Sequence, residues 1–193
     1  NYNILEKIRA FIAINLSSDI KEYLSSLKNN LKIGNSKIKW VEENNLHITL
    51  KFLGYILPQQ LELIDLGLKK ITNQYLPFSI KLSSDIGIFP SYKMPRIIWV
   101  GIRESSRELT ELYNSIEETL YKNGFPKENK RFSGHITIGR IKYIKDKDSL
   151  INSLKQIRIE RFSQKVESVE LMESELTPKG PVYHVFHKYL LLK

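Results

Sequence analysis

Two histidines of this sequence stand in the same short pattern, and imidazole is the side chain whose charge changes most readily near neutral pH. Residues 46–50 read LHITL and residues 134–138 read GHITI, so His-Ile-Thr followed by an aliphatic residue occurs twice. The two copies contain His47 and His135, and the chain has 4 histidines in 193 residues. Random placement rarely produces such a repeat, which favours a functional pair over coincidence.

Each copy predicts a strand with one polar and one apolar face. Side chains alternate along a strand, so His47 and Thr49 share one face and the aliphatic residues beside them share the other. His135 and Thr137 are related in the same way. If the chain is an approximate internal duplication, both polar faces meet at one cleft, with two imidazoles and two hydroxyls around a single object.

That set of groups suits the cleavage of a phosphodiester. Displacement at phosphorus is in line, and two imidazoles on opposite sides of the phosphorus supply a base and an acid. Threonine hydroxyls can donate to the non-bridging oxygens, where charge builds up. With enough donors no metal is required, and we expect neither a metal nor another cofactor.

Two basic residues close to the motifs are candidates for holding the phosphate. Arg140 can grip a phosphate through two hydrogen bonds, but strict alternation turns it to the wrong face, so a bulge or strand end at Gly139 is required. Lys51 lies two residues past Thr49 and is expected on the same face, where it would steer phosphate. An ordinary exposed strand lysine explains Lys51 equally well.

The charge balance is strongly basic. Lysine and arginine number 30 against 21 aspartates and glutamates, giving a net charge of +9 and a pI near 9.5. This surplus suits a polyanion such as nucleic acid, although a well-solvated surface accounts for it as well. The absence of cysteine excludes disulfides, thiolate metal sites and a cysteine nucleophile. Without a glycine-rich phosphate loop, dependence on ATP is not expected.

Several other side chains have a plainer interpretation than catalysis. His184 and His187 are three residues apart, so on a strand they face opposite ways and cannot share a metal without a bend. Tyr183 is assigned to the closing strand rather than to the cleft. The aromatic residues with apolar neighbours are assigned to the core rather than to base stacking: Trp40, Phe52 and Phe132.

Composition and periodicity predict one mixed α+β domain over residues 1–193. Hydrophobic residues make up 41% and charged residues 26%. No apolar run approaches the ~18 residues of a membrane span, so we expect a cytoplasmic protein without a signal peptide. The expected strands are 9–15, 39–41, 46–53, 78–89, 95–102, 132–143, 161–176 and 182–192. Four helices are expected: the first begins after the cap residues Ser17–Asp19 and ends at Gly34, and the second spans 58–74. The third begins after a cap at Ser105 or Ser106 and ends at 123–124, and the fourth spans 146–156.

The two motifs resemble the paired His-x-Thr signatures of the 2H phosphoesterase superfamily. More narrowly, the chain resembles the RNA 2′,3′-cyclic phosphodiesterases, also called 2′-5′ RNA ligase-like proteins, nearly from end to end. One departure is Gly134, where the family usually has proline, which would loosen the backbone before the second histidine. The matching segments are 9–16, 40–54, 87–102, 131–142 and 167–185.

The resemblance implies a bilobal fold with two antiparallel sheets, and helices related by a pseudo-twofold, around a central cleft. It also implies that His47 donates a proton to the leaving oxygen and that His135 accepts one from water. RNA with a 2′,3′-cyclic phosphate end, such as a tRNA fragment, would yield a 2′-phosphate end, and the reverse reaction would form a 2′-5′ bond. Arg96, beside the family's middle hairpin, is a candidate RNA contact.

Two alternatives remain open. A basic RNA-binding domain could hold phosphate on the same strands without turnover, although intact histidines and threonines in both motifs favour an enzyme. A related 2H enzyme could act on a small cyclic nucleotide or an ADP-ribose cyclic phosphate. We expect a monomer that does not bind membranes.

Overall fold

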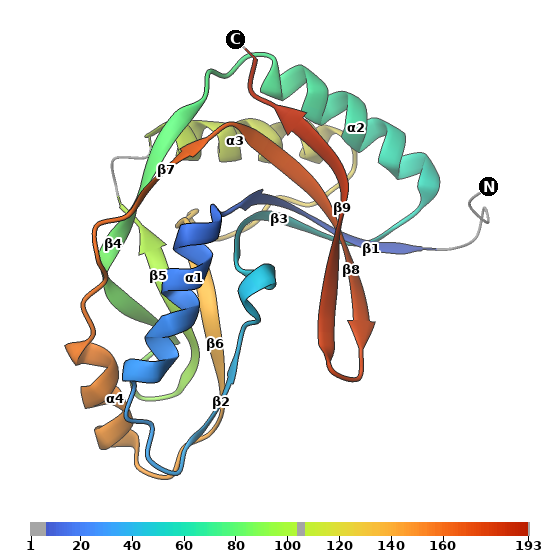
Figure 1. Ribbon diagram of the computed structural model, residues 1–193. Helices are drawn as coiled ribbons and strands as arrows, with labels where there is room; N and C mark the ends of the chain where they lie inside the picture. Colours follow the sequence, from blue (N-terminus) through green and yellow to red (C-terminus); the bar gives the residue numbers. More distant parts are fainter. Residues whose placement is uncertain (1–6, 104–106, 193) are drawn as a thin grey trace.

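Strands and helices are interspersed along the chain in the computed structural model, which describes residues 7–103 and 107–192 (Figure 1). The strands found there are β1 (Ile8–Asn15), β2 (Lys37–Trp40), β3 (His47–Ile56), β4 (Phe78–Pro90), β5 (Pro95–Ile102), β6 (His135–Tyr143), β7 (Ser163–Val166), β8 (Ser168–Thr177) and β9 (Gly180–Leu190). The helices are α1 (Ser18–Ser26), α2 (Pro58–Thr72), α3 (Arg107–Lys122) and α4 (Lys147–Gln156).

These elements confirm most of those expected from periodicity, with two differences. The first helix ends at Ser26 and continues as a 3-10 turn over Leu27–Asn30, because two consecutive asparagines are poor helix formers. The long strand expected over 161–176 is divided at Glu167, because β7 pairs with β4 whereas β8 pairs with β1. The expected caps of α3, Ser105 and Ser106, lie outside the described residues.

All strand pairs are antiparallel, and the strands form two half-sheets that meet along one narrow seam. The strand order is β7-β4-β5-β6-β3-β1-β8-β9, with β2 added to β6. β3 and β6 are joined by a single residue pair, Ile48 with Ile136, and both side chains are fully buried. This α+β arrangement confirms the bilobal fold.

Each half-sheet contains strands from both halves of the chain. β1 and β3 are completed by β8 and β9 from the C-terminal end, whereas β5 and β6 are completed by β4. Helices α2 and α3 pack against each other and α3 contacts β3, while α4 contacts β4 in the other half (Figure 1). If the chain is divided into two repeats, β1 to β4 and β5 to β8, the last strand of each repeat lies in the half-sheet that contains the first strand of the other: β4 pairs with β5, and β8 pairs with β1.

The core lies between these half-sheets and the helices that cover them. It is made mainly of isoleucine and leucine, as the alternating strands and helical stripes predict. Within residues 7–103 and 107–192, no helix is both long and apolar enough to cross a bilayer.

A bulge in β3 changes which side chains face the core. Ile12 of β1 pairs with Lys51, but Ala13 pairs with Thr49, so Leu50 is an extra residue on β3. Leu50 and Lys51 are consequently both buried, and Phe52 is exposed. The prediction that Lys51 shares the face of the histidine and steers phosphate is wrong for this reason.

Lys51 instead forms a buried ion pair with Glu117 of α3. Its ammonium also donates to the carbonyl of Pro126 at 2.9 Å, and the second oxygen of Glu117 accepts the backbone N–H of Glu128 at 2.9 Å. The pair therefore ties β3 to α3 and to the loop that leads toward β6. Buried charges need such complete hydrogen bonding to offset their desolvation.

Replacing Lys51 by methionine should cost about 3–5 kcal/mol of unfolding free energy, because the Glu117 carboxylate remains buried without its partner. Urea unfolding followed by circular dichroism measures this loss. Lys69→Met is the matched control: Lys69 pairs with Asp65 on the surface, so its loss should stay within about 1 kcal/mol. Equal losses for the two lysines would contradict the assigned role of Lys51.

Candidate active site

His47 is held at the start of β3 by two hydrogen bonds. Its Nδ1 lies 2.7 Å from the carbonyl of Asn45, in the 3-10 turn Glu43–Asn45, and its Nε2 lies 2.7 Å from Oγ1 of Thr49. A carbonyl only accepts, so Nδ1 carries the proton. In the neutral ring, Nε2 then accepts a hydrogen bond from the Thr49 hydroxyl.

His135 uses the same device at the start of β6. Its Nδ1 lies 2.8 Å from the carbonyl of Ser133, again two residues before the histidine. The proton of the neutral ring is therefore fixed on Nδ1 here as well, and Nε2 is the nitrogen that meets a substrate. His135 is exposed, whereas His47 is partly buried.

The seam between the half-sheets brings the two motifs together. Ile48 and Ile136 lie directly opposite each other and point into the core. Residues on either side of such a pair point the other way, so both histidines and both threonines lie on one face of the sheet. The two imidazoles are close enough that the charge of His135 affects the pKa of His47.

The surroundings of His47 lower its pKa below the ordinary value of 6.5. Burial is the main cause, because it disfavours the imidazolium ion, and the positive charges of Lys21 and His135 act in the same direction. The hydrogen bond to the Asn45 carbonyl opposes this shift. In the unliganded protein, His47 is therefore neutral at pH 7.

Two aromatic rings enclose His47. Phe11 of β1 lies with its ring centroid 5.0 Å away, and Tyr183 of β9 meets the imidazole edge-on at 5.4 Å. The assignment of Tyr183 to the closing strand alone was therefore wrong, because this side chain also lines the site. The missing information was the pairing of β8 with β1, which brings the end of the chain next to His47.

Arg140 lies on the exposed side of β6, as its predicted role requires. Ile98 pairs with Gly139 but Trp99 pairs with Thr137, so the required bulge is present, with Ile138 as its extra residue. Burial raises the pKa of the Tyr183 phenol, and the charge of Arg140 partly offsets this increase. Arg140 thus contributes positive potential next to the tyrosine that packs on His47.

Trp99 is a second residue that sequence reasoning missed. Its ring meets the ring of His135 at a centroid distance of 5.8 Å and an angle of 64°. Gly87 and Gly101 make room for it: a Cβ atom at Gly87 would lie 2.2 Å from the indole ring, and one at Gly101 would lie 3.1 Å from it. Gly87, opposite Trp99 on β4, and Gly101, two residues after Trp99 on β5, were the available signal.

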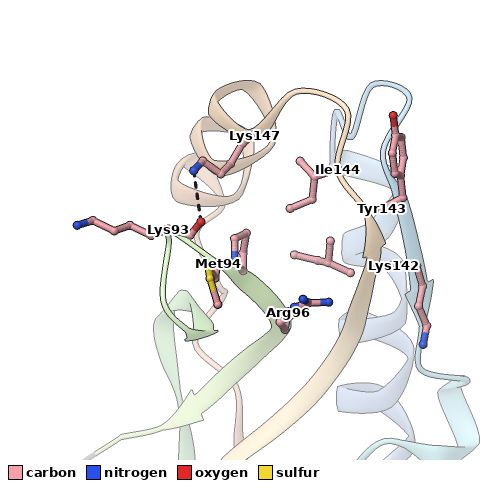
Figure 2. Close-up of a pocket in the computed structure, with 9 residues that line it drawn as sticks. Lys93, Met94, Arg96, Lys142, Tyr143, Ile144 and Lys147 are labelled. Carbon is pink, nitrogen blue, oxygen red and sulfur yellow. Dashed lines mark hydrogen bonds between the residues drawn. The ribbon is translucent and has the colours of Figure 1, made fainter.

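Arg96 lies along a shallow hollow of about 300 Å³ between the start of β5, the end of β6 and α4. Lys93, Lys142 and Lys147 also line it, and the Lys147 ammonium donates to the Lys93 carbonyl at 3.3 Å (Figure 2). The hollow is basic and partly apolar, which suits a polyanion. The contact of Arg96 with RNA stays a prediction.

The aromatic residues assigned to the core differ in their surroundings. Phe132 stacks on Tyr113 at 4.1 Å, and Trp40 packs against the core beside Gly139, so both agree with that assignment. Phe52 is 66% exposed, and its assignment was wrong. The bulge before it turns its side chain away from the core.

Gly134, just before the second motif, is held firmly. Its carbonyl accepts the N–H of Ile102 at 2.8 Å, and an added Cβ would lie 3.0 Å from Leu109 and 3.3 Å from Ile102. Close packing on α3 therefore explains a residue without a side chain here. It does not support the expectation of a looser backbone before the second histidine.

The two remaining histidines contact a carboxylate and an aromatic ring instead of a backbone carbonyl. His184 lies 3.3 Å from Glu175, and His187 packs on the ring of Tyr189. In the part of the chain that the structure describes, no three His, Asp or Glu side chains are grouped so that they could hold a metal ion.

Paired His-x-Thr strands at the seam of two half-sheets define the class as phosphoesterases with two histidines. The family model described as LigT like Phosphoesterase matches the chain twice in succession, over residues 14–99 and 100–183. The chain belongs to this family of enzymes.

Known relatives agree with this assignment. The chain is 37% identical over 177 residues to the RNA 2′,3′-cyclic phosphodiesterase of Archaeoglobus fulgidus, covering 91% of this chain and 96% of that protein. It is 36% identical over 191 residues to the enzyme of the same name from Aquifex aeolicus, covering 97% and 99%. A Thermus thermophilus crystal structure matches with a TM-score of 0.79 at 25% identity, covering 95% and 98%.

The geometry of His47 predicts its titration. In the unliganded protein its pKa should lie below 6.5, with the neutral proton on Nδ1, because burial and nearby positive charges disfavour the imidazolium ion. A pH series of ¹⁵N–¹H multiple-bond NMR spectra, assigned with His47→Gln, measures both properties. A pKa above 6.5, or a neutral ring protonated on Nε2, would contradict the site as described.

Proposed function

We propose that this protein hydrolyses the 2′,3′-cyclic phosphate end of RNA to a 2′-phosphate by metal-independent acid–base catalysis. The observation that carries the proposal is the repeated anchoring of Nδ1 on a backbone carbonyl, at Asn45 for His47 and at Ser133 for His135. Both rings thereby reserve Nε2 for the substrate. Relatives named RNA 2′,3′-cyclic phosphodiesterase support the choice of substrate.

In the proposed reaction, Nε2 of His135 accepts a proton from water, and the water oxygen forms a bond to phosphorus. The bond from phosphorus to the 3′ oxygen breaks, and Nε2 of His47 gives its proton to that oxygen. The hydroxyls of Thr49 and Thr137 donate to the non-bridging oxygens as negative charge increases. With an RNA 5′-hydroxyl in place of water as the attacking group, the same steps form a 2′-5′ bond, and the 3′ oxygen again leaves with the proton of His47.

The lowered pKa of His47 sets a condition on this assignment of roles. An acid must carry its proton, yet the unliganded ring is neutral at pH 7. The phosphodiester anion raises the pKa of a nearby imidazole, because an opposite charge favours the imidazolium ion. His47 therefore acquires its proton when substrate binds, and Thr49 then accepts a hydrogen bond from Nε2 until the leaving oxygen replaces it.

RNA is favoured over a small cyclic nucleotide by charge. The chain carries a net charge of +9, and Arg140 contributes to the positive potential at the site. A polyanion gains from such a potential along its whole length, whereas a mononucleotide interacts with it at one phosphate.

A short RNA ending in a 2′,3′-cyclic phosphate should be converted to a 2′-phosphate end in the presence of EDTA and without ATP. The two phosphate positions are resolved by chromatography against synthetic standards. His47→Ala and His135→Ala should each abolish turnover, because each removes one of the two proton carriers. A 3′-phosphate product, complete inhibition by EDTA, or a mere tenfold loss in either variant would refute the mechanism.

Thr49→Val and Thr137→Val should each lower kcat by roughly 10- to 1000-fold, because each removes one donor to the developing charge. Steady-state kinetics on the same RNA measure the loss. Thr49→Ser keeps the hydroxyl that bonds to His47 and should recover most of the rate. Unchanged kcat in both valine variants would remove the threonines from the proposed mechanism.

A further inference from the structure

Two large aromatic side chains of β3 lie in solvent just beyond the catalytic motif. Phe52 is 66% exposed and Tyr55 is 63% exposed. A half-buried strand ordinarily keeps such residues in its apolar face. Exposed aromatic rings next to an active site commonly mark a binding surface.

The register of β3 shows that both rings share the face of the catalytic side chains. Phe52 lies opposite Phe11, whose ring touches the rings of both His47 and Phe52. Phe11 therefore stands between the imidazole and Phe52, and the three rings form a continuous row.

Tyr55 is placed on the same face through a second chain of contacts. It lies opposite Arg9, whose guanidinium donates to Ser174 at 2.8 Å. Ser174 lies opposite Tyr183, which packs edge-on against His47. The surface that extends from the imidazole along β1 and β3 thus carries exposed rings and a guanidinium.

Two irregularities of β3 produce this surface. The bulge at Leu50 turns Phe52 outward, and a second register shift, between the Phe11–Phe52 and Ala10–Gly54 pairs, keeps Tyr55 on the same side. Gly54 has a φ of +70°, which glycine adopts without strain. Strict alternation would have turned Phe52 into the core, so the bulges bring a row of aromatics to the side that holds the imidazole.

Single-stranded RNA is the ligand that fits such a surface. Aromatic rings stack on any base, and neighbouring cations attract the phosphates between the bases. The ring of Phe11 separates Phe52 from His47. Phe52 is therefore too far from the imidazole to contact the phosphate held there, but it is within reach of the neighbouring nucleotides.

We propose that Phe52 and Tyr55 form a stacking platform for the bases that precede the terminal nucleotide, with Arg9 beside it. The proposal rests on the proposed function, because it takes the cyclic phosphate to lie between the two histidines. The platform makes the enzyme prefer an RNA strand to a cyclic mononucleotide. The preference is independent of base sequence, because stacking uses the face of the base.

Binding is tested with a fluorescent hexaribonucleotide that ends in a 2′-phosphate, so that no turnover is needed. Phe52→Ala and Tyr55→Ala should each weaken binding about tenfold in fluorescence anisotropy. Phe52→Trp should bind the RNA as tightly as the wild-type protein, whereas Phe52→Leu should bind it as weakly as Phe52→Ala. Tyr121→Ala, which removes a tyrosine of α3 that is 56% exposed, is the control and should leave affinity unchanged.

An abasic residue placed next to the end of the RNA identifies the stacked base. In the wild-type protein it should cost about tenfold in affinity at one of the positions nearest the end. In Phe52→Ala or Tyr55→Ala it should cost nothing further, because the ring that met that base is gone. If the abasic residue lowers the affinity of both ring variants by the same factor as that of the wild-type protein, the proposal is overturned.

Kinetics separate this proposal from the function on which it rests. The ratio of kcat/KM for the cyclic-phosphate oligomer to that for a nucleoside 2′,3′-cyclic phosphate should fall about tenfold in Phe52→Ala. An equal loss on both substrates would show that the ring serves the imidazole rather than the strand, and would overturn the platform. If wild-type protein cleaves neither substrate, the proposed function fails, and the binding experiments alone decide on the platform.

Discussion

The contact of Ile48 with Ile136 is the constraint on which the site depends. It is the pair through which β3 and β6 join the two half-sheets, and both side chains are fully buried. Because the two residues face the core together, the residues on either side of them must face away from it together. Two imidazoles and two hydroxyls are thereby gathered by the burial of two aliphatic side chains. Pairing of β3 with β6 does not extend beyond this contact, so the segments that carry the polar groups do not form a regular hydrogen-bonded ladder with each other.

Within this symmetric frame, the two histidines have different environments. Each has its Nδ1 on the carbonyl two residues earlier, so the backbone sets the same tautomer twice. The rings around them differ: His47 is packed by Phe11 and Tyr183, whereas His135 meets the indole of Trp99 and remains exposed. Burial shifts the protonation of His47 toward the neutral form. A duplicated motif therefore gives chemically distinct groups through the neighbours supplied by other strands.

The sequence was sufficient to predict the features that depend on the periodicity of apolar side chains along a single segment. The His-x-Thr strands and the main helices follow from the period of apolar residues along one segment, whereas the bulge before Arg140 was expected only because the role of that arginine required it. Alternation failed at Leu50, because an extra residue in β3 is compensated only by the partner strand β1, and this placed Lys51 and Phe52 on the wrong faces. Tyr183 and Trp99 could not be assigned to the site because their positions depend on which strands pair across the sheet. The ion pair of Lys51 with Glu117, 66 residues away, depends on the same long-range register.

The exchange of the last strand between the two repeats has a consequence for how such a chain could arise. β4 ends the first repeat, β1 to β4, but pairs with β5, and β8 ends the second repeat, β5 to β8, but pairs with β1. A polypeptide made of one repeat alone would leave its final strand without a sheet to join. Two copies of it could satisfy each other by trading that strand, which is a domain-swapped homodimer. Joining the copies end to end would then have turned a concentration-dependent assembly into an intramolecular one, and would have freed each half to acquire its own neighbours.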